Sequence, residues 1–229
     1  MQMEVLTDGN NTAARAAEII AADARAAVEA RGKFIMAVSG GKSPWLMLAD
    51  LANQHVPWKN VHVFQIDERI APPGDPDRNY THLRASLLEH VPIPEQQIYP
   101  MPVNSPDLDA AAQQYARTLE SIAGAPPVLD LAHLGIGTNG HTASLLPGDP
   151  VLDVIDRDVA VTANAFEGHR RMTMTFPMIN RSRKILWLVV AADKAAMLRR
   201  MLAADKSIPA GRISQSQAVI LADRSAAGE

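Results

Sequence analysis

The chain has 229 residues, of which 47% are hydrophobic, and its formal net charge is −3. This is the composition of a folded globular protein, and without any block of like charge it gives no sign of a nucleic-acid or anionic-membrane surface. The lack of cysteine excludes disulfides and thiolate chemistry and fits a reducing compartment. No apolar run approaches the ~18 residues of a membrane span, and the start MQMEVLTDGN lacks the regions of a signal peptide, so we expect a cytoplasmic protein.

The elements alternate along the chain. Residues 11–31 are rich in alanine and carry their charges on one face, which predicts an amphipathic helix. Residues 34–38, FIMAV, form the first predicted strand, because they are continuously apolar and too short for a helix. Further strands are predicted at 61–66, 129–136, 171–176, 184–191 and 217–222, and further helices at 44–55, 80–90, 108–122 and 193–203.

Strands that alternate with helices predict an α/β fold: a doubly wound, mostly parallel sheet with helices on both faces. Without a repeat, a long linker or a break in composition, residues 1–229 are predicted to form a single domain. Ligands bind such sheets outside the carboxyl ends of the strands. Three polar loops follow predicted strands and should meet at that edge: Ser39-Gly40-Gly41, Asp67-Glu68-Arg69 and Asn139-Gly140-His141.

The segment MAVSGGKSP, residues 36–44, is a candidate phosphate site. Gly41-Lys42-Ser43 matches the end of a nucleotide-binding P-loop, but that motif needs a glycine where this chain has Met36. What remains is a tight turn whose glycines let the backbone approach an anion, followed by a helix N-terminus that favours negative charge. One phosphate on a small molecule therefore fits better than a nucleoside triphosphate, and an ordinary glycine-rich turn is the alternative.

His141 is a candidate general base, because an imidazole on a tight turn can take a proton from water at neutral pH. Gly135, Gly137 and Gly140 have the spacing of a dinucleotide-binding turn, but that turn normally opens the first βα unit and this one lies in mid-chain. The other histidines show no metal-ligand spacing, so no metal is expected.

Five landmarks occur in order along nearly the whole chain: Ser39-Gly40-Gly41-Lys42-Ser43-Pro44, Asp67-Glu68-Arg69 with Arg78-Asn79-Tyr80, LGIGTNGHTASLLPG at 134–148, Arg171-Met172-Thr173 and Asp193-Lys194-Ala195. In this combination the chain resembles the 6-phosphogluconolactonase family, which belongs with the glucosamine-6-phosphate deaminases to one larger, Rossmann-like group. The deaminases carry a glutamate for sugar ring opening where this chain has Leu146. The resemblance is therefore to the lactonase branch.

The resemblance implies hydrolysis of 6-phospho-D-glucono-1,5-lactone to 6-phosphogluconate, a step of the oxidative pentose phosphate pathway. It implies no cofactor, no partner beyond the small phosphorylated lactone, and a monomer or small homo-oligomer. His141 would act as the base with Asn139 orienting it, Asp67 would bind sugar hydroxyls, and Arg69 would stabilise the oxyanion. The phosphate would be held by Ser39, Gly40, Gly41, Arg171 and Lys194.

Two positions depart from the family pattern. Asn139 stands where lactonases usually have aspartate, and an amide can orient an imidazole but cannot stabilise an imidazolium with charge. We expect either a weaker base or another carboxylate, such as Asp67 or Glu68, in that role. The proline-rich stretch before Arg-x-Thr is replaced by FEGHR, which leaves open whether Arg170 or Arg171 contacts the phosphate.

Two alternatives remain at this stage. A glucosamine-6-phosphate deaminase would use the same fold and is disfavoured by Leu146. A non-catalytic sugar-phosphate-binding regulator would usually carry a helix-turn-helix domain. With the first strand predicted near residue 34, the sequence has no room for one.

Overall fold

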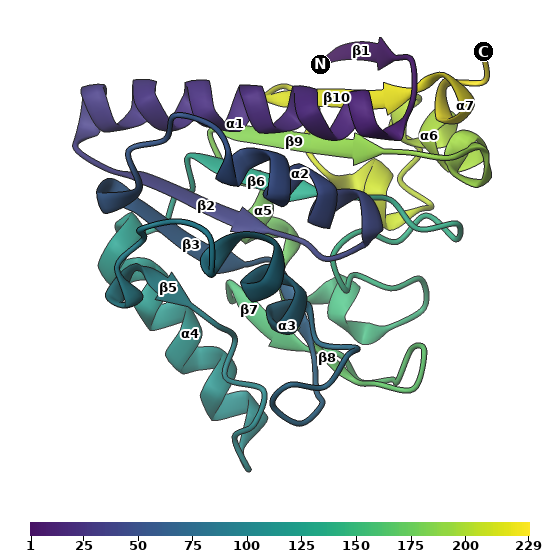
Figure 1. Ribbon diagram of the computed structural model, residues 1–229. Coiled ribbons are helices and arrows are strands. Elements are labelled where there is room, and N and C mark those ends of the chain that lie inside the picture. The colour runs from purple at the N-terminus through teal and green to yellow at the C-terminus, as the bar shows by residue number, and fades with distance from the viewer.

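The structure, a computed structural model, describes residues 1–229 and contains a parallel sheet of seven strands (Figure 1). Every neighbouring pair in it is parallel. Its order is β1 (Gln2–Leu6), β10 (Ala218–Asp223), β9 (Lys184–Val189), β6 (Leu131–Leu134), β2 (Phe34–Val38), β3 (Val61–Gln65) and β5 (Ile98–Tyr99). The predicted parallel α/β fold is confirmed.

Helices cover both faces of this sheet (Figure 1). One face carries α1 (Gly9–Arg31), α2 (Lys42–Ala52) and α3 (Asn79–Leu83), which runs into the π-helical turn Arg84–Leu88. The other face carries α4 (Leu108–Ala123), α5 (Phe176–Asn180) and α6 (Ala195–Leu202). A short helix, α7 (Arg224–Ala227), follows β10 and ends the chain beside α6.

Alternate residues of the central strands serve two hydrophobic cores. In β2, Phe34, Met36 and Val38 belong to the core under α1 and α2, whereas Ile35 and Ala37 belong to the core on the other face. Because successive side chains of a strand point to opposite faces, a strand covered on both sides must be apolar throughout. This is why the run FIMAV predicted β2 at its exact bounds.

A second sheet of three antiparallel strands, β4 (Asp67–Arg69), β8 (Arg171–Met174) and β7 (Val159–Val161), adjoins the carboxyl end of β3. Ile66 joins the two sheets, because its N–H donates to Val38 O at 3.0 Å and its carbonyl accepts from Met174 N at 2.8 Å. The small sheet thereby brings Asp67 and Arg171 to the edge where β2 and β6 also end.

The sequence prediction was wrong in several places. Asp67-Glu68-Arg69, predicted as a loop, is the strand β4, and the short strands β5 and β7 lie where no strand was predicted. The first strand is β1, at Gln2–Leu6, and not the strand at residue 34; it is an edge strand whose residues are largely exposed, so it shows no continuous apolar run. The predicted strand at 171–176 ends at Met174 and belongs to the antiparallel sheet, since Thr175 and Pro177 begin α5 there.

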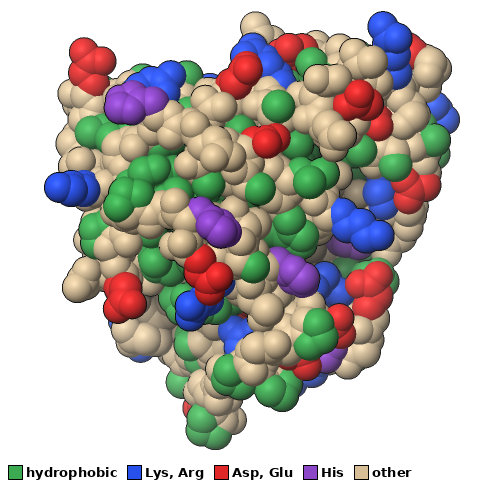
Figure 2. Space-filling model, in the orientation of Figure 1, with side chains coloured by type: hydrophobic (Ala, Val, Ile, Leu, Met, Phe, Trp, Pro, Cys, Tyr) green, Lys and Arg blue, Asp and Glu red, His purple; other side chains and the backbone are tan.

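No helix is both long and apolar enough to cross a bilayer. On the face shown in Figure 2, acidic and basic side chains are interspersed and neither kind gathers into a broad patch.

Candidate active site

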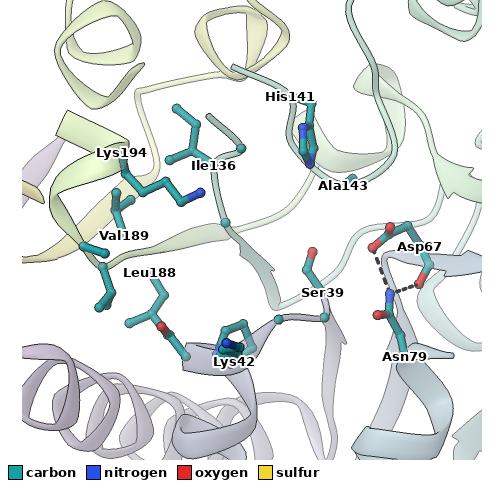
Figure 3. Close-up of a pocket in the computed structure, with 18 of the residues that line it drawn as sticks. Ser39, Lys42, Asp67, Asn79, Ile136, His141, Ala143, Leu188, Val189 and Lys194 are labelled. Carbon is teal, nitrogen blue, oxygen red and sulfur yellow. Dashed lines mark hydrogen bonds between the residues drawn. The ribbon is translucent and has the colours of Figure 1, made fainter. Parts of the chain in front are cut away.

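A cavity of about 620 Å³ opens at the carboxyl edge of the parallel sheet. The three loops that the sequence predicted to meet do so, because Ser39, Asp67 and His141 all line it. Figure 3 shows Ser39, His141 and Lys194 pointing into the same space from different sides, with Asp67 and Asn79 at its border. The site is therefore assembled from segments far apart in the sequence.

The turn between β2 and α2 presents its backbone to the cavity. A Cβ on Gly40 would lie 1.9 Å from Asn79 Oδ1, and Gly41 has φ +130°, so the turn requires glycine at both places. Gly41 caps α2 without a side-chain hydrogen bond, which leaves first-turn N–H groups unpaired. The buried Ser39 hydroxyl also has no partner within the protein. The backbone N–H groups of the turn and the Ser39 hydroxyl are donors that suit an anion. Lys42 lies exposed at the rim of the cavity.

A buried histidine lies beneath this turn. His133 in β6 is fully buried, and burial lowers its pKa to about 3, so the ring is neutral. Its Nδ1 accepts a long hydrogen bond, 3.4 Å, from the backbone N–H of Ser39. The ring is thus a structural support for the turn.

The carboxylate of Glu68 fixes the loop that crosses the site. It is fully buried and accepts hydrogen bonds from the backbone N–H groups of Arg69, Asn79 and Tyr80 at 2.7–2.8 Å. It also accepts from Gln65 Nε2 at 2.9 Å and faces the buried Arg78 guanidinium at 3.4 Å. Its hydrogen-bonding capacity is filled by these groups, so it serves structure and does not contact His141.

Asp67 points its carboxylate toward the cavity. One oxygen accepts a 2.6 Å hydrogen bond from the buried Ser144 hydroxyl, while the other has only a 3.5 Å contact with Asn79 Nδ2. Asn79 Nδ2 also donates to the Asp67 carbonyl at 3.0 Å (Figure 3). A carboxylate held on one side and open on the other can accept a hydrogen bond from a ligand hydroxyl.

The His141 ring is held in one orientation and one tautomer. Asn139 Oδ1 lies 2.6 Å from Nδ1 and also accepts from the His141 backbone N–H at 3.1 Å. Because an amide oxygen only accepts, Nδ1 carries the proton and Nε2 keeps its lone pair. A Cβ on Gly137 would lie 2.2 Å from the ring, so only glycine lets the imidazole occupy this place.

The surroundings keep His141 neutral. Its pKa is lowered to about 4, chiefly by burial and next by the Arg171 guanidinium. Lys194 and Arg69 act in the same direction, and the carboxylate of Glu167 opposes them. The carboxylate that acts on the ring is thus Glu167, where the sequence had suggested Asp67 or Glu68. Above a pH of about 4 the ring is able to accept a proton.

Four cationic side chains line the cavity: Lys42, which is exposed at the rim, and Arg69, Arg171 and Lys194. The Nε atoms of Arg69 and Arg171 are buried without a partner within the protein. Of the two arginines left open by the sequence, Arg171 is buried in the cavity wall, whereas Arg170 is exposed and donates to Thr162 O at 2.9 Å. No group of His, Asp and Glu side chains is arranged to hold a metal ion.

Known proteins resemble this chain in sequence and in fold. The model of the family described as glucosamine-6-phosphate isomerases/6-phosphogluconolactonase matches residues 7–221. The chain belongs to this family. It is 38% identical to the 6-phosphogluconolactonase of Synechocystis sp., over 88% of this chain and 85% of that one. It is 37% identical to that of Mycobacterium tuberculosis, over 99% and 97%. The crystal structure of the Thermotoga maritima 6-phosphogluconolactonase matches with a TM-score of 0.86 at 26% identity, over 97% and 98%.

The sequence analysis did not identify several residues of this site. Glu167 and Asp193 line the cavity, and Ser144 supports Asp67 from outside it. Asn79 and Ser144 lie inside the quoted landmarks, which could have pointed to them. Glu167 lies in the stretch that departs from the family pattern, so no landmark marked it.

Replacing Glu68 by alanine should lower the free energy of unfolding by about 3–5 kcal/mol, because it leaves buried N–H groups and the Arg78 charge unpaired. Urea denaturation measures the loss. Glu18→Ala is the matched control, since the carboxylate of Glu18 is 55% exposed in its pair with Arg15, and should cost less than about 1 kcal/mol. Equal losses in the two variants would contradict the role given to Glu68.

Asn139→Asp should raise the pKa of His141 from about 4 toward its ordinary value of 6.5, because a carboxylate beside Nδ1 stabilises the imidazolium. The variant ring would then be charged in a range of mildly acidic pH where the wild-type ring is neutral. NMR titration of the ring protons in both proteins measures the two values. An unchanged pKa would show that Asn139 does not govern the protonation of the ring.

Proposed function

We propose that the protein hydrolyses 6-phospho-D-glucono-1,5-lactone to 6-phosphogluconate. One observation carries this proposal: a single cavity holds both a possible base and a possible phosphate site. The base is a neutral imidazole whose Nε2 has no partner, and the phosphate site is formed by cations and backbone N–H donors. The names of the relatives agree with it. The reaction is that of a carboxylic ester hydrolase acting in the oxidative pentose phosphate pathway.

His141 is proposed to act as the base. Its Nε2 takes a proton from a water molecule as the water oxygen attacks the lactone carbonyl carbon. The tetrahedral intermediate then collapses, the bond between that carbon and the ring oxygen breaks, and the proton passes from Nε2 to the ring oxygen, which becomes a hydroxyl. Asn139 holds the opposite nitrogen throughout, so the ring cannot turn its protonated edge toward the water.

The cations are assigned two roles. Arg171 and Lys194, with the turn Ser39-Gly40-Gly41, bind the phosphate, and Arg69 stabilises the negative charge that develops on the carbonyl oxygen. Binding the phosphate away from the reacting carbon orients the ring, and this positioning contributes to catalysis in addition to the base.

Asp67 is proposed to accept hydrogen bonds from sugar hydroxyls through its open oxygen. The residues present complete the reaction without a metal or cofactor, so none is expected to be needed. The single domain, the cytoplasmic location and the monomer or small homo-oligomer stay predictions.

A glucosamine-6-phosphate deaminase is the alternative enzyme. The residue that replaces its glutamate, Leu146, is buried and does not line the cavity, so no carboxylate takes that place. A sugar-phosphate-binding protein without turnover is the other alternative. Ammonia release from glucosamine 6-phosphate, or binding without hydrolysis, would favour one or the other.

The direct test is the rate at which the protein opens freshly generated 6-phosphogluconolactone, with spontaneous hydrolysis subtracted. His141→Ala should lower kcat by about 10²–10⁴-fold, since a general base contributes that much. His90→Ala is the matched control, because His90 is exposed and lies outside the cavity, and it should keep the wild-type rate. A folded wild-type protein with no rate above background would sink the proposal.

The adjacent arginines allow a second test, with each replaced by methionine to preserve most of the side-chain volume. Arg171→Met should reduce kcat/KM for the phosphorylated lactone by more than about tenfold, because a charge-assisted contact with the phosphate is lost. Arg170→Met should leave kcat/KM within about twofold of wild type, because an exposed charge outside the cavity contributes little. If Arg170→Met proved the more damaging change, the assignment of the phosphate to Arg171 would be wrong.

A further inference from the structure

Both side chains assigned to the phosphate already carry a carboxylate partner. Glu167 Oε2 lies 2.9 Å from Arg171 Nη2, and Asp193 Oδ2 lies 3.2 Å from Lys194 Nζ. All four residues line the cavity. The carboxylates are much more exposed than the cations: the side chain of Glu167 is 67% exposed against 4% for Arg171, and that of Asp193 is 55% exposed against 26% for Lys194.

The backbone around Glu167 is unusual. Phe166 and His169 are bridged by hydrogen bonds of 2.9 and 3.3 Å, and the two residues between them, Glu167 and Gly168, have φ of +51° and +84°. Positive φ at both central positions is the geometry of a type I′ turn, which favours asparagine or glycine. A glutamate there is uncommon, and this conformation places its carboxylate on the Arg171 guanidinium.

The two members of this ion pair differ in what they lose when it breaks. A guanidinium as buried as that of Arg171 is costly to leave without a counter-charge. The exposed carboxylate of Glu167 keeps most of its hydration, so it loses little when another anion takes its place on the arginine. A phosphate carries more charge than a carboxylate and has more acceptor oxygens, so it is the stronger partner for the same arginine.

We propose that Glu167 is a displaceable counter-ion: it neutralises Arg171 in the empty protein, gives way to the phosphate of the substrate, and returns as the phosphate of the product leaves. The inference rests on the proposed function and deepens it. Because hydrolysis leaves the phosphate unchanged, every contact that binds the substrate phosphate also retains the product. A competing carboxylate weakens that retention and limits inhibition by product. Asp193 acts in the same way on Lys194.

The test uses inorganic phosphate as the probe, measured by isothermal titration calorimetry. Glu167→Gln removes the competing charge and keeps the size of the side chain, so phosphate should bind about three- to tenfold more tightly than to wild type. The inhibition constant of 6-phosphogluconate should fall by a similar factor. Asp193→Asn should act in the same direction. Glu120→Gln is the matched control, because it removes the same charge from an exposed residue on α4 that lies outside the cavity. It should leave both constants unchanged.

The outcomes separate this inference from the proposed function. Phosphate bound by wild type, but no more tightly by Glu167→Gln, would overturn the role of Glu167 and leave the phosphate site standing. Equal tightening by Glu167→Gln and Glu120→Gln would also overturn it, because net charge alone would then explain the effect. No phosphate binding by wild type would contradict the phosphate site itself, and the inference with it.

Discussion

The site depends on one buried carboxylate. Glu68 is the middle residue of β4, and its two carboxylate oxygens hold the backbone of Arg69, Asn79 and Tyr80. This closes the loop between β4 and α3 over the edge of the sheet. A parallel sheet leaves the carboxyl ends of its strands open to solvent, and loops of this length are free to move unless something fixes them. Here a charge inside the protein does so, and it needs its full set of donors to remain there.

The consequences of this closure extend across the cavity. With its backbone fixed, Asn79 reaches both the carbonyl of Asp67 and the space above Gly40, where a side chain on that glycine would collide with it. The turn Ser39-Gly40-Gly41 and the carboxylate of Asp67 are therefore placed by the same asparagine. Ile66 adds the other link, since it is bonded to both sheets and sets where Arg171 enters. Binding and chemistry share one rigid frame, which is what precise positioning of a small substrate requires.

Charge distribution decides the state of the base. Three of the cations that line the cavity lower the pKa of His141, and the Nδ1 of this histidine contacts the amide of Asn139 and not a carboxylate. Such a ring is neutral and ready to accept a proton, but the imidazolium it becomes is poorly stabilised in the empty site. In the proposed complex, a phosphate bound to Arg171 and Lys194 would offset part of their effect on the pKa of His141. The substrate would then supply part of the negative charge that an amide at position 139 cannot provide.

Much of this arrangement could be predicted from the sequence. Fully buried strands such as β2 require continuous apolar runs, and the carboxyl-edge rule then brought Ser39, Asp67 and His141 together. Prediction failed where the determining contacts are not local. The edge strand β1 is paired on one side only and needs no apolar run. The partners of Glu68 lie up to twelve residues away, and the ion pair of Glu167 arises from a turn that only the folded chain defines.

The phosphate and the reacting carbon are proposed to bind in this one cavity, with the carbon beside His141, and a crystal structure with bound 6-phosphogluconate is the direct test. We expect the phosphate to lie on the Ser39-Gly40-Gly41 turn, in contact with Arg171 and Lys194. The carboxylate formed by hydrolysis should lie beside His141 Nε2 and Arg69. A product bound in the reverse direction, or outside the cavity, would contradict it.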